Sequence, residues 1–257
     1  MRATVSVPRA TAVELPKAVF FDMDDTIFDH ALTCRRALAR LRRADGSLGG
    51  RTLDEIWQEY SRLLEAVHSE VLAGRVSVQA SRTERFRRLA EFCGNVISTE
   101  TAAELSRRYR EHYLEVRRTV PGIRPVLERL YGRTVVGIVT NNQVAEQEEK
   151  LDHFGLRPLI DFMVVSEGVG VAKPDPKIFE VALDRADVAA KDAVMIGDSW
   201  TSDVVGARAT GIRPIWFNRF HLSRPDPWPV AELDSFRKPA RVEATVAGRS
   251  DGRAGSR

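Results

Sequence analysis

Two aspartates stand two residues apart, directly after a short apolar run. Residues 18–21 are predicted to form a buried strand, and Asp22 and Asp24 follow at its carboxyl end. In an open α/β sheet, ligands bind at this end of the strands. Because clustered carboxylates are costly to bury without a cation, the pair predicts a site for a metal ion and a phosphate. Taken alone, the same residues also fit an acidic turn that caps the next helix.

Two further segments place polar side chains after predicted strands. Thr140 and Asn141 follow residues 134–139, and such a turn can bind phosphoryl oxygens, although it is also an ordinary helix N-cap. Lys173 precedes Pro174, which restricts the lysine backbone. A positioned ammonium group can neutralise both a carboxylate and a phosphate. The alternative is a solvent-exposed lysine in a loop that needs proline for rigidity.

A second pair of carboxylates, Asp198 and Asp203, follows the predicted strand at residues 193–196. Beside Asp22 and Asp24, these side chains would make an oxygen-rich site that suits Mg²⁺. Any one carboxylate would more often cap a helix. However, an Asp pair, a Thr, a Lys and a second Asp pair at four strand ends, in chain order, are hard to explain by capping.

The elements that position these residues alternate between strand and helix after residue 121. Short Val- and Ile-rich segments separated by helices of about ten residues indicate βαβ units and a parallel sheet. The predicted fold class is therefore α/β, with a Rossmann-like sheet. We expect strands at 18–21, 134–139, 162–165, 193–196 and 214–217, and helices at 123–131, 143–154, 176–186 and 201–210.

Between the first and second strands, residues 29–118 have helical periodicity and predict an inserted helical subdomain. Three capping-box signals predict helix starts at Thr52, Ser81 and Thr101, each followed by Glu three residues later. The predicted domain organisation comprises a core at 16–28 and 119–222, a helical subdomain at 29–118, a disordered start at 1–15, and a largely disordered, Pro-, Arg- and Gly-rich tail at 223–257.

The composition limits the classes of partner. The 257 residues are 43% hydrophobic and 29% charged, and the formal net charge of +3 is too small to argue for nucleic acid. No apolar run approaches the roughly 20 residues that span a bilayer. Cys34 and Cys93 are too few for a disulfide framework and suit a cytosolic enzyme. We therefore expect a cytoplasmic monomer or homodimer that acts on a small molecule, with no nucleic acid or membrane partner.

These motifs together resemble those of the haloacid dehalogenase-like (HAD) hydrolase superfamily. The resemblance covers about residues 18–218, with all four family motifs in order at strand ends, and Asp25 stands where Gly is common. The helical insertion is similar to the family's small α-helical cap, and the core is most similar to nucleotidase and N-acylneuraminate-9-phosphatase-like members. The matching residues are Asp22-Met23-Asp24-Asp25-Thr26, Thr140-Asn141, Lys173-Pro174, and Gly197-Asp198-Ser199 with Asp203.

The resemblance implies a role for each matching residue in phosphoryl transfer. Asp22 would be the nucleophile that forms an aspartyl-phosphate. Asp24 would protonate the leaving oxygen and then deprotonate the hydrolytic water. Thr140 and the Asn141 backbone would hold phosphoryl oxygens, and Lys173 would steady Asp22 and the phosphate.

The resemblance also implies a Mg²⁺ site. A carboxylate oxygen of Asp22, the backbone carbonyl of Asp24 and Asp198 would bind the ion. Asp203 would support the metal-bound waters or ligate directly. This division of labour agrees with the electrostatics, because a phosphate dianion cannot approach an anionic nucleophile unless cations are nearby.

Asp24 also indicates the branch of the superfamily. The dehalogenase branch resembles Asp-x-Tyr at this site, and the phosphonatase branch needs a cap lysine, whereas this chain has no Lys between 17 and 150. We expect a Mg²⁺-dependent phosphomonoester hydrolase that acts on a 5′-nucleotide or a sugar phosphate. The alternatives are a phosphosugar mutase and a catalytically silent HAD-fold binding or regulatory protein. In the cap, Arg75, Arg82 and Arg85 would either meet an anionic substrate or solvate a helix face.

Overall fold

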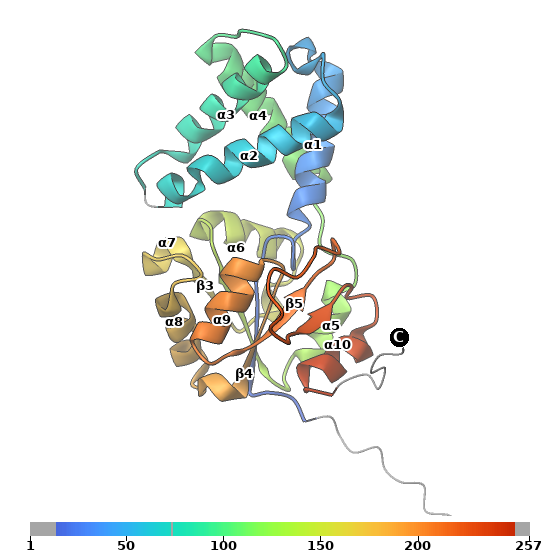
Figure 1. Ribbon diagram of the computed structural model, residues 1–257, viewed down its shortest axis with the longest axis vertical. Helices are drawn as coiled ribbons and strands as arrows, with labels where there is room; N and C mark the ends of the chain where they lie inside the picture. The colour runs from blue at the N-terminus through green and yellow to red at the C-terminus, as the bar shows by residue number, and fades with distance from the viewer. Residues whose placement is uncertain (1–13, 73, 250–257) are drawn as a thin grey trace, which may run out of the picture.

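A six-stranded parallel sheet forms the core of the computed structural model, which describes residues 14–249 except residue 73 (Figure 1). The strand order is β3-β2-β1-β4-β5-β6, so the strand that precedes Asp22 is central. The predicted α/β class with a Rossmann-like parallel sheet is confirmed. The strands are β1 (Ala18–Phe21), β2 (Val135–Thr140), β3 (Phe162–Val165), β4 (Ala193–Gly197), β5 (Arg213–Phe217) and β6 (Ala231–Leu233).

Helices cover both faces of this sheet because its central strands are apolar on both sides. In β1, Val19 and Phe21 join one apolar cluster, which includes residues of α5 and α10, while Ala18 and Phe20 join the other, which includes residues of α8 and α9. The helical elements of the core are α5 (Ile123–Leu130), α6 (Val144–His153), α7 (Ser166–Val169), α8 (Pro176–Ala186), α9 (Gly206–Ala209) and α10 (Pro239–Val246), with short turns η2 (Arg157–Leu159), η3 (Ala190–Asp192) and the π-helical η4 (Trp200–Val205).

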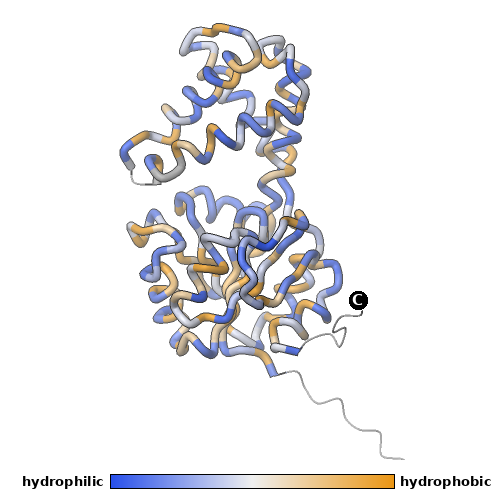
Figure 2. The backbone as a smooth tube through the Cα atoms, in the orientation of Figure 1, coloured by the Kyte–Doolittle hydropathy of each residue, from blue (hydrophilic) through white to orange (hydrophobic). Residues whose placement is uncertain are grey.

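A helical cap follows β1 and sits above the sheet (Figure 1). Apolar and polar residues alternate along its helices, as expected for amphipathic elements (Figure 2). No helix in the described ranges has the length and apolarity needed to cross a membrane. The cap comprises α1 (His30–Ala44), η1 (Gly46–Leu48), α2 (Leu53–Leu72), α3 (Val78–Phe92) and α4 (Thr99–Val116).

The helix starts in the cap follow the capping signals only in part. At α2, Thr52 and Glu55 exchange the expected hydrogen bonds. The predictions for α3 and α4 are wrong by about one turn, because the N-caps are Ser77 and Ser98. Ser81 consequently lies inside α3, where it is buried.

The prediction of a largely disordered segment at 223–257 is wrong for its described part. Strand β6 pairs with β5, and α10 packs on α5. Phe236 is fully buried and stacks on Phe217, with ring centroids 4.0 Å apart and an interplanar angle of 4°. The prediction relied on the Pro- and Arg-rich composition of this segment. A few widely spaced apolar residues in it nevertheless pack on one face of the sheet. Residues 250–257, and residues 1–13 of the expected disordered start, lie outside the described ranges.

Replacing Phe236 with alanine is expected to lower the free energy of unfolding by about 3–5 kcal/mol, the usual cost of removing a buried phenyl ring. Urea denaturation followed by circular dichroism measures this loss. Phe220→Ala is the matched control, because that ring is 48% exposed, and we expect a change below about 1 kcal/mol. Equal stability of the two variants would show that the C-terminal segment is not part of the folding core.

Candidate active site

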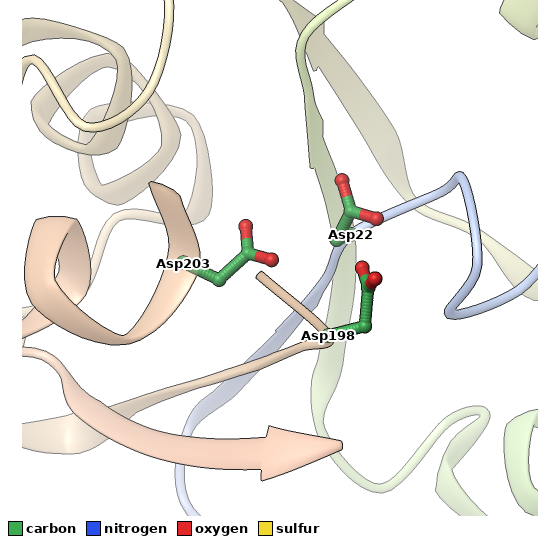
Figure 3. A group of neighbouring side chains, drawn as sticks. All are labelled: Asp22, Asp198 and Asp203. Carbon is green, nitrogen blue, oxygen red and sulfur yellow. The ribbon is translucent and has the colours of Figure 1, made fainter. Parts of the chain in front are cut away.

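Three carboxylates meet at the carboxyl ends of β1 and β4 (Figure 3). Asp22 directly follows β1, Asp198 follows β4, and Asp203 comes from η4. Each offers an oxygen atom within 4.8 Å of the others. Gly197 permits this approach, because a Cβ atom at that position would lie 2.2 Å from Oδ2 of Asp203. The sheet register and one glycine therefore bring together three of the four carboxylates predicted to form the site, and the Asp24 carboxylate is not in this group.

The cluster is buried and electrostatically crowded. Burial raises the pKa of Asp22 to about 7, against the opposing charge of Lys173. Burial and the neighbouring Asp22 also raise the pKa of Asp198 well above its usual range. One lysine cannot balance the negative charge of three ionised carboxylates, so the cluster favours a bound cation. A donor set made only of oxygen atoms suits a hard divalent cation such as Mg²⁺. The residues present therefore fit the metal that the sequence predicted.

Lys173 is the cation inside this cluster. Its Nζ atom lies 2.6 Å from Oδ1 of Asp22, 2.6 Å from Oδ1 of Asp203 and 2.7 Å from the carbonyl oxygen of Val139. Although burial opposes the charge, Asp203 and Asp22 raise the pKa of Lys173 above its usual value. The ammonium group is thus charged and held by three acceptors.

Asn141 positions the lysine from the neighbouring strand end. Its side-chain oxygen accepts a hydrogen bond from the backbone N–H of Lys173 at 2.7 Å, and its side-chain nitrogen donates to the Lys173 carbonyl at 2.9 Å. The predicted phosphate-binding turn after β2 is therefore fastened to the lysine loop by two hydrogen bonds. The asparagine amide acts as a clamp here, a role that sequence reasoning did not anticipate.

Asp24 has different neighbours from Asp22. Its carboxylate accepts hydrogen bonds from Lys150 at 2.5 Å, and from Asn142 and Gln147 at 3.0 Å each. Burial opposes ionisation, but Lys150 and then His30 bring the pKa of Asp24 below its usual range. To donate a proton, Asp24 must first move away from the Lys150 ammonium. The three donors therefore restrain the Asp24 side chain, and its lowered pKa favours the carboxylate form.

The three donors to Asp24 were missed by sequence reasoning. Gln147 and Lys150 are buried polar residues three positions apart on α6, and Gln147 also donates a hydrogen bond to the hydroxyl of buried Thr140 at 2.9 Å. The available signal was the placement of both residues on the same helix face as the apolar Leu151. A buried lysine on such a face needs an anionic partner, and Asp24 is that partner within the described part of the chain.

A cavity of about 400 Å³ lies between the cap and the core and is lined by residues of both. Asp24 and Asn141 line its core side. The three cap arginines singled out in the sequence behave differently. Arg75 pairs with Glu70 at the surface, whereas Arg82 lines the cavity and pairs with Glu146, and Arg85 lines the cavity without a carboxylate partner in the described ranges.

Comparison with known proteins agrees with this architecture. The family of haloacid dehalogenase-like hydrolases matches residues 16–211. The pyrimidine 5′-nucleotidase YjjG of Escherichia coli is 29% identical over 220 residues, which cover 84% of this chain and 93% of that protein. The ribulose-1,5-bisphosphate 5-phosphatase of Halopiger xanaduensis is 32% identical over 206 residues, which cover 78% and 84%.

A solved structure shares both domains of the fold. The 2-haloacid dehalogenase of Pseudomonas syringae is 30% identical and has a TM-score of 0.60, with 90% of this chain and 99% of that chain covered. The sheet, the inserted cap and the acidic cluster are those of an α/β hydrolase with two domains, a core and a helical cap. The chain belongs to the haloacid dehalogenase-like hydrolase family.

Proposed function

We propose that this protein is a Mg²⁺-dependent phosphomonoester hydrolase that acts through an aspartyl-phosphate on a small phosphorylated metabolite. The observation that carries the proposal is the buried Lys173, which bridges Asp22 and Asp203 inside the carboxylate cluster. A nucleophilic carboxylate held by a lysine and open to a metal is suited to a phosphate dianion. Phosphatase and nucleotidase relatives support the same reaction class.

In the proposed first step, an Asp22 oxygen forms a bond to phosphorus as the ester P–O bond breaks. Asp24, once it has released Lys150 and gained a proton, gives that proton to the leaving oxygen. Water then attacks the phosphorus of the acyl phosphate and passes a proton back to Asp24. The bond between phosphorus and the Asp22 oxygen breaks, so that phosphate is released and the Asp22 carboxylate is restored.

The remaining residues position the phosphate and neutralise its charge. The Thr140 hydroxyl and the Asn141 backbone would bind phosphoryl oxygens, while Lys173 stays on Asp22. Asp22, the Asp24 carbonyl and Asp198 would hold Mg²⁺, with Asp203 supporting the site. The ion supplies charge neutralisation and orientation for the incoming phosphate.

Dehalogenation is the second candidate, because a structural relative is a 2-haloacid dehalogenase. Asp24 favours phosphate transfer, since removal of halide needs no acid at this position. A phosphosugar mutase would use the same four motifs and would isomerise a sugar phosphate without releasing phosphate. A catalytically silent binding protein is less well supported, because none of the predicted nucleophile, acid and metal carboxylates is missing.

The test is phosphate release from p-nitrophenyl phosphate with Mg²⁺, with EDTA, and with Mg²⁺ restored. We expect turnover with Mg²⁺, a loss of at least about 10²-fold in EDTA because the carboxylate cluster repels the phosphate, and full recovery on addition of Mg²⁺. Chloride release from 2-chloropropionate is measured in parallel. Halide release without phosphate release, or phosphate release indifferent to EDTA, would contradict the proposal.

A further inference from the structure

We propose that the substrate carries a second anionic group, a carboxylate or a further phosphate, and that Arg85 of the cap binds it. The inference rests on the proposed function, because it assumes that the substrate's reacting phosphate lies at Asp22. It names the substrate class that the core alone leaves open.

Arg85 is a buried arginine, 7% exposed, and no described residue serves as its counter-ion. Its Nη1 atom donates to the Tyr60 hydroxyl at 3.1 Å and its Nη2 atom to the Ser81 hydroxyl at 3.4 Å, but Nε has no hydrogen-bond partner among the residues that the structure describes. No ion pair within the described ranges includes this side chain. Other arginines of α3 do have carboxylate partners: Arg82 pairs with Glu146, and Arg87 and Arg88 pair with Glu84.

Such an arrangement is unusual for a group that cannot lose its charge. Arginine stays protonated in proteins, and a buried charge is normally paired. The Tyr60 ring lies 5.2 Å from the guanidinium carbon and gives some cation–π stabilisation. Hydroxyl groups and a ring face are neutral, however, and a guanidinium fork is best matched by a carboxylate or a phosphate. The missing partner is therefore an anion from outside the described residues.

The cavity shows where that anion would come from. Arg85 and Tyr60 line its cap side, while Asp24 and Asn141 line its core side, within one volume of about 400 Å³. This size is typical of sites for small metabolites. Tyr109 and Tyr113 also line the cavity, and their rings continue from Tyr60 toward His30, with Tyr109 against Tyr60 and Tyr113 against both Tyr109 and His30. A single ligand can thus place one phosphate at the core and a second anion at Arg85.

The test compares kcat/KM for four phosphate monoesters. The first carries a carboxylate, the second carries a further phosphate, and the third is the carboxylic methyl ester of the first, which removes that negative charge. The fourth is UMP, whose base is neutral. For Arg85→Gln we expect a loss of about 10²-fold on one or both anionic substrates, mainly in KM, and less than about threefold on the neutral substrates. Arg85→Lys should recover part of the loss, because it keeps the charge without the fork.

Arg88→Gln is the matched control, since Arg88 lies on the same helix and is exposed; it should leave all four substrates unchanged. Equal losses on charged and neutral substrates would overturn the inference and make Arg85 a brace for the cap. A selective loss on UMP would overturn it in favour of recognition of base carbonyls. Thermal unfolding of each variant separates these results from misfolding.

Binding of 3-phosphonopropionate, measured by calorimetry, distinguishes failure of this inference from failure of the proposed function. If the protein hydrolyses none of the esters, the proposed function is wrong, yet tight binding that Arg85→Gln abolishes still supports the anion site. Binding by Arg85→Gln at wild-type affinity would contradict the site whether or not turnover occurs.

Discussion

Replacing Asp22 with asparagine is expected to reduce phosphate release from p-nitrophenyl phosphate by about four orders of magnitude or more, as removal of a covalent nucleophile does in other hydrolases. An amide cannot form the acyl phosphate. The fold should survive, because asparagine has the same shape and removes one of three crowded carboxylates. Lys173 keeps its contacts with Asp203 and Val139.

The matched control is Asp184→Asn, an exposed aspartate on α8, which should retain wild-type turnover. Mg²⁺ should raise the melting temperature of the wild-type protein more than that of Asp22→Asn, because one metal ligand is lost. Normal turnover by Asp22→Asn would refute the assignment of the nucleophile.

Lys173→Met should lower kcat/KM by about 10³-fold and also destabilise the protein. Methionine fills the same space, but Asp22 and Asp203 lose their shared cation in a site that is almost fully buried. Breaking a buried ion pair from one side costs about 3–5 kcal/mol. Activity falls for a separate reason, because the ammonium no longer offsets the charge of the incoming phosphate.

Stability and activity should therefore respond differently to Mg²⁺ in Lys173→Met. The ion should restore part of the lost stability by neutralising the carboxylates, but it should not restore turnover. Lys177→Met on α8 is the control, since Lys177 is exposed and its ion pair with Glu180 is long, at 3.6 Å. Wild-type kcat/KM in Lys173→Met would show that the lysine is only structural.

The acidic cluster was predictable because parallel strands bring their carboxyl ends to one edge of a sheet. Asp22 and Asp198 follow from that rule and from chain order, whereas Lys173 comes after α7 and is positioned by its hydrogen bonds with Asn141. The restraint of Asp24 was not predictable in the same way. It depends on which face α6 turns toward β1, and the alternation of strands and helices does not determine that rotation.

The cap and the C-terminal segment show a different limit. The sequence predicted helices in the cap, but Ser77 and Ser98 compete as caps with Ser81 and Thr101, and packing selects between them. The C-terminal segment has too few apolar residues to signal order locally. Phe236 becomes a core residue only because Phe217 and the rest of that sheet face already exist to pack against it.

The central claim, covalent catalysis by Asp22, is tested most directly by trapping the acyl phosphate. The enzyme is mixed with substrate and Mg²⁺, quenched during turnover and treated with borohydride, which reduces an aspartyl-phosphate to homoserine. Peptide mass spectrometry then locates the modified residue. We predict homoserine at position 22 in the wild-type protein and none in Asp22→Asn; turnover with unmodified Asp22, or homoserine at another aspartate, would contradict the account.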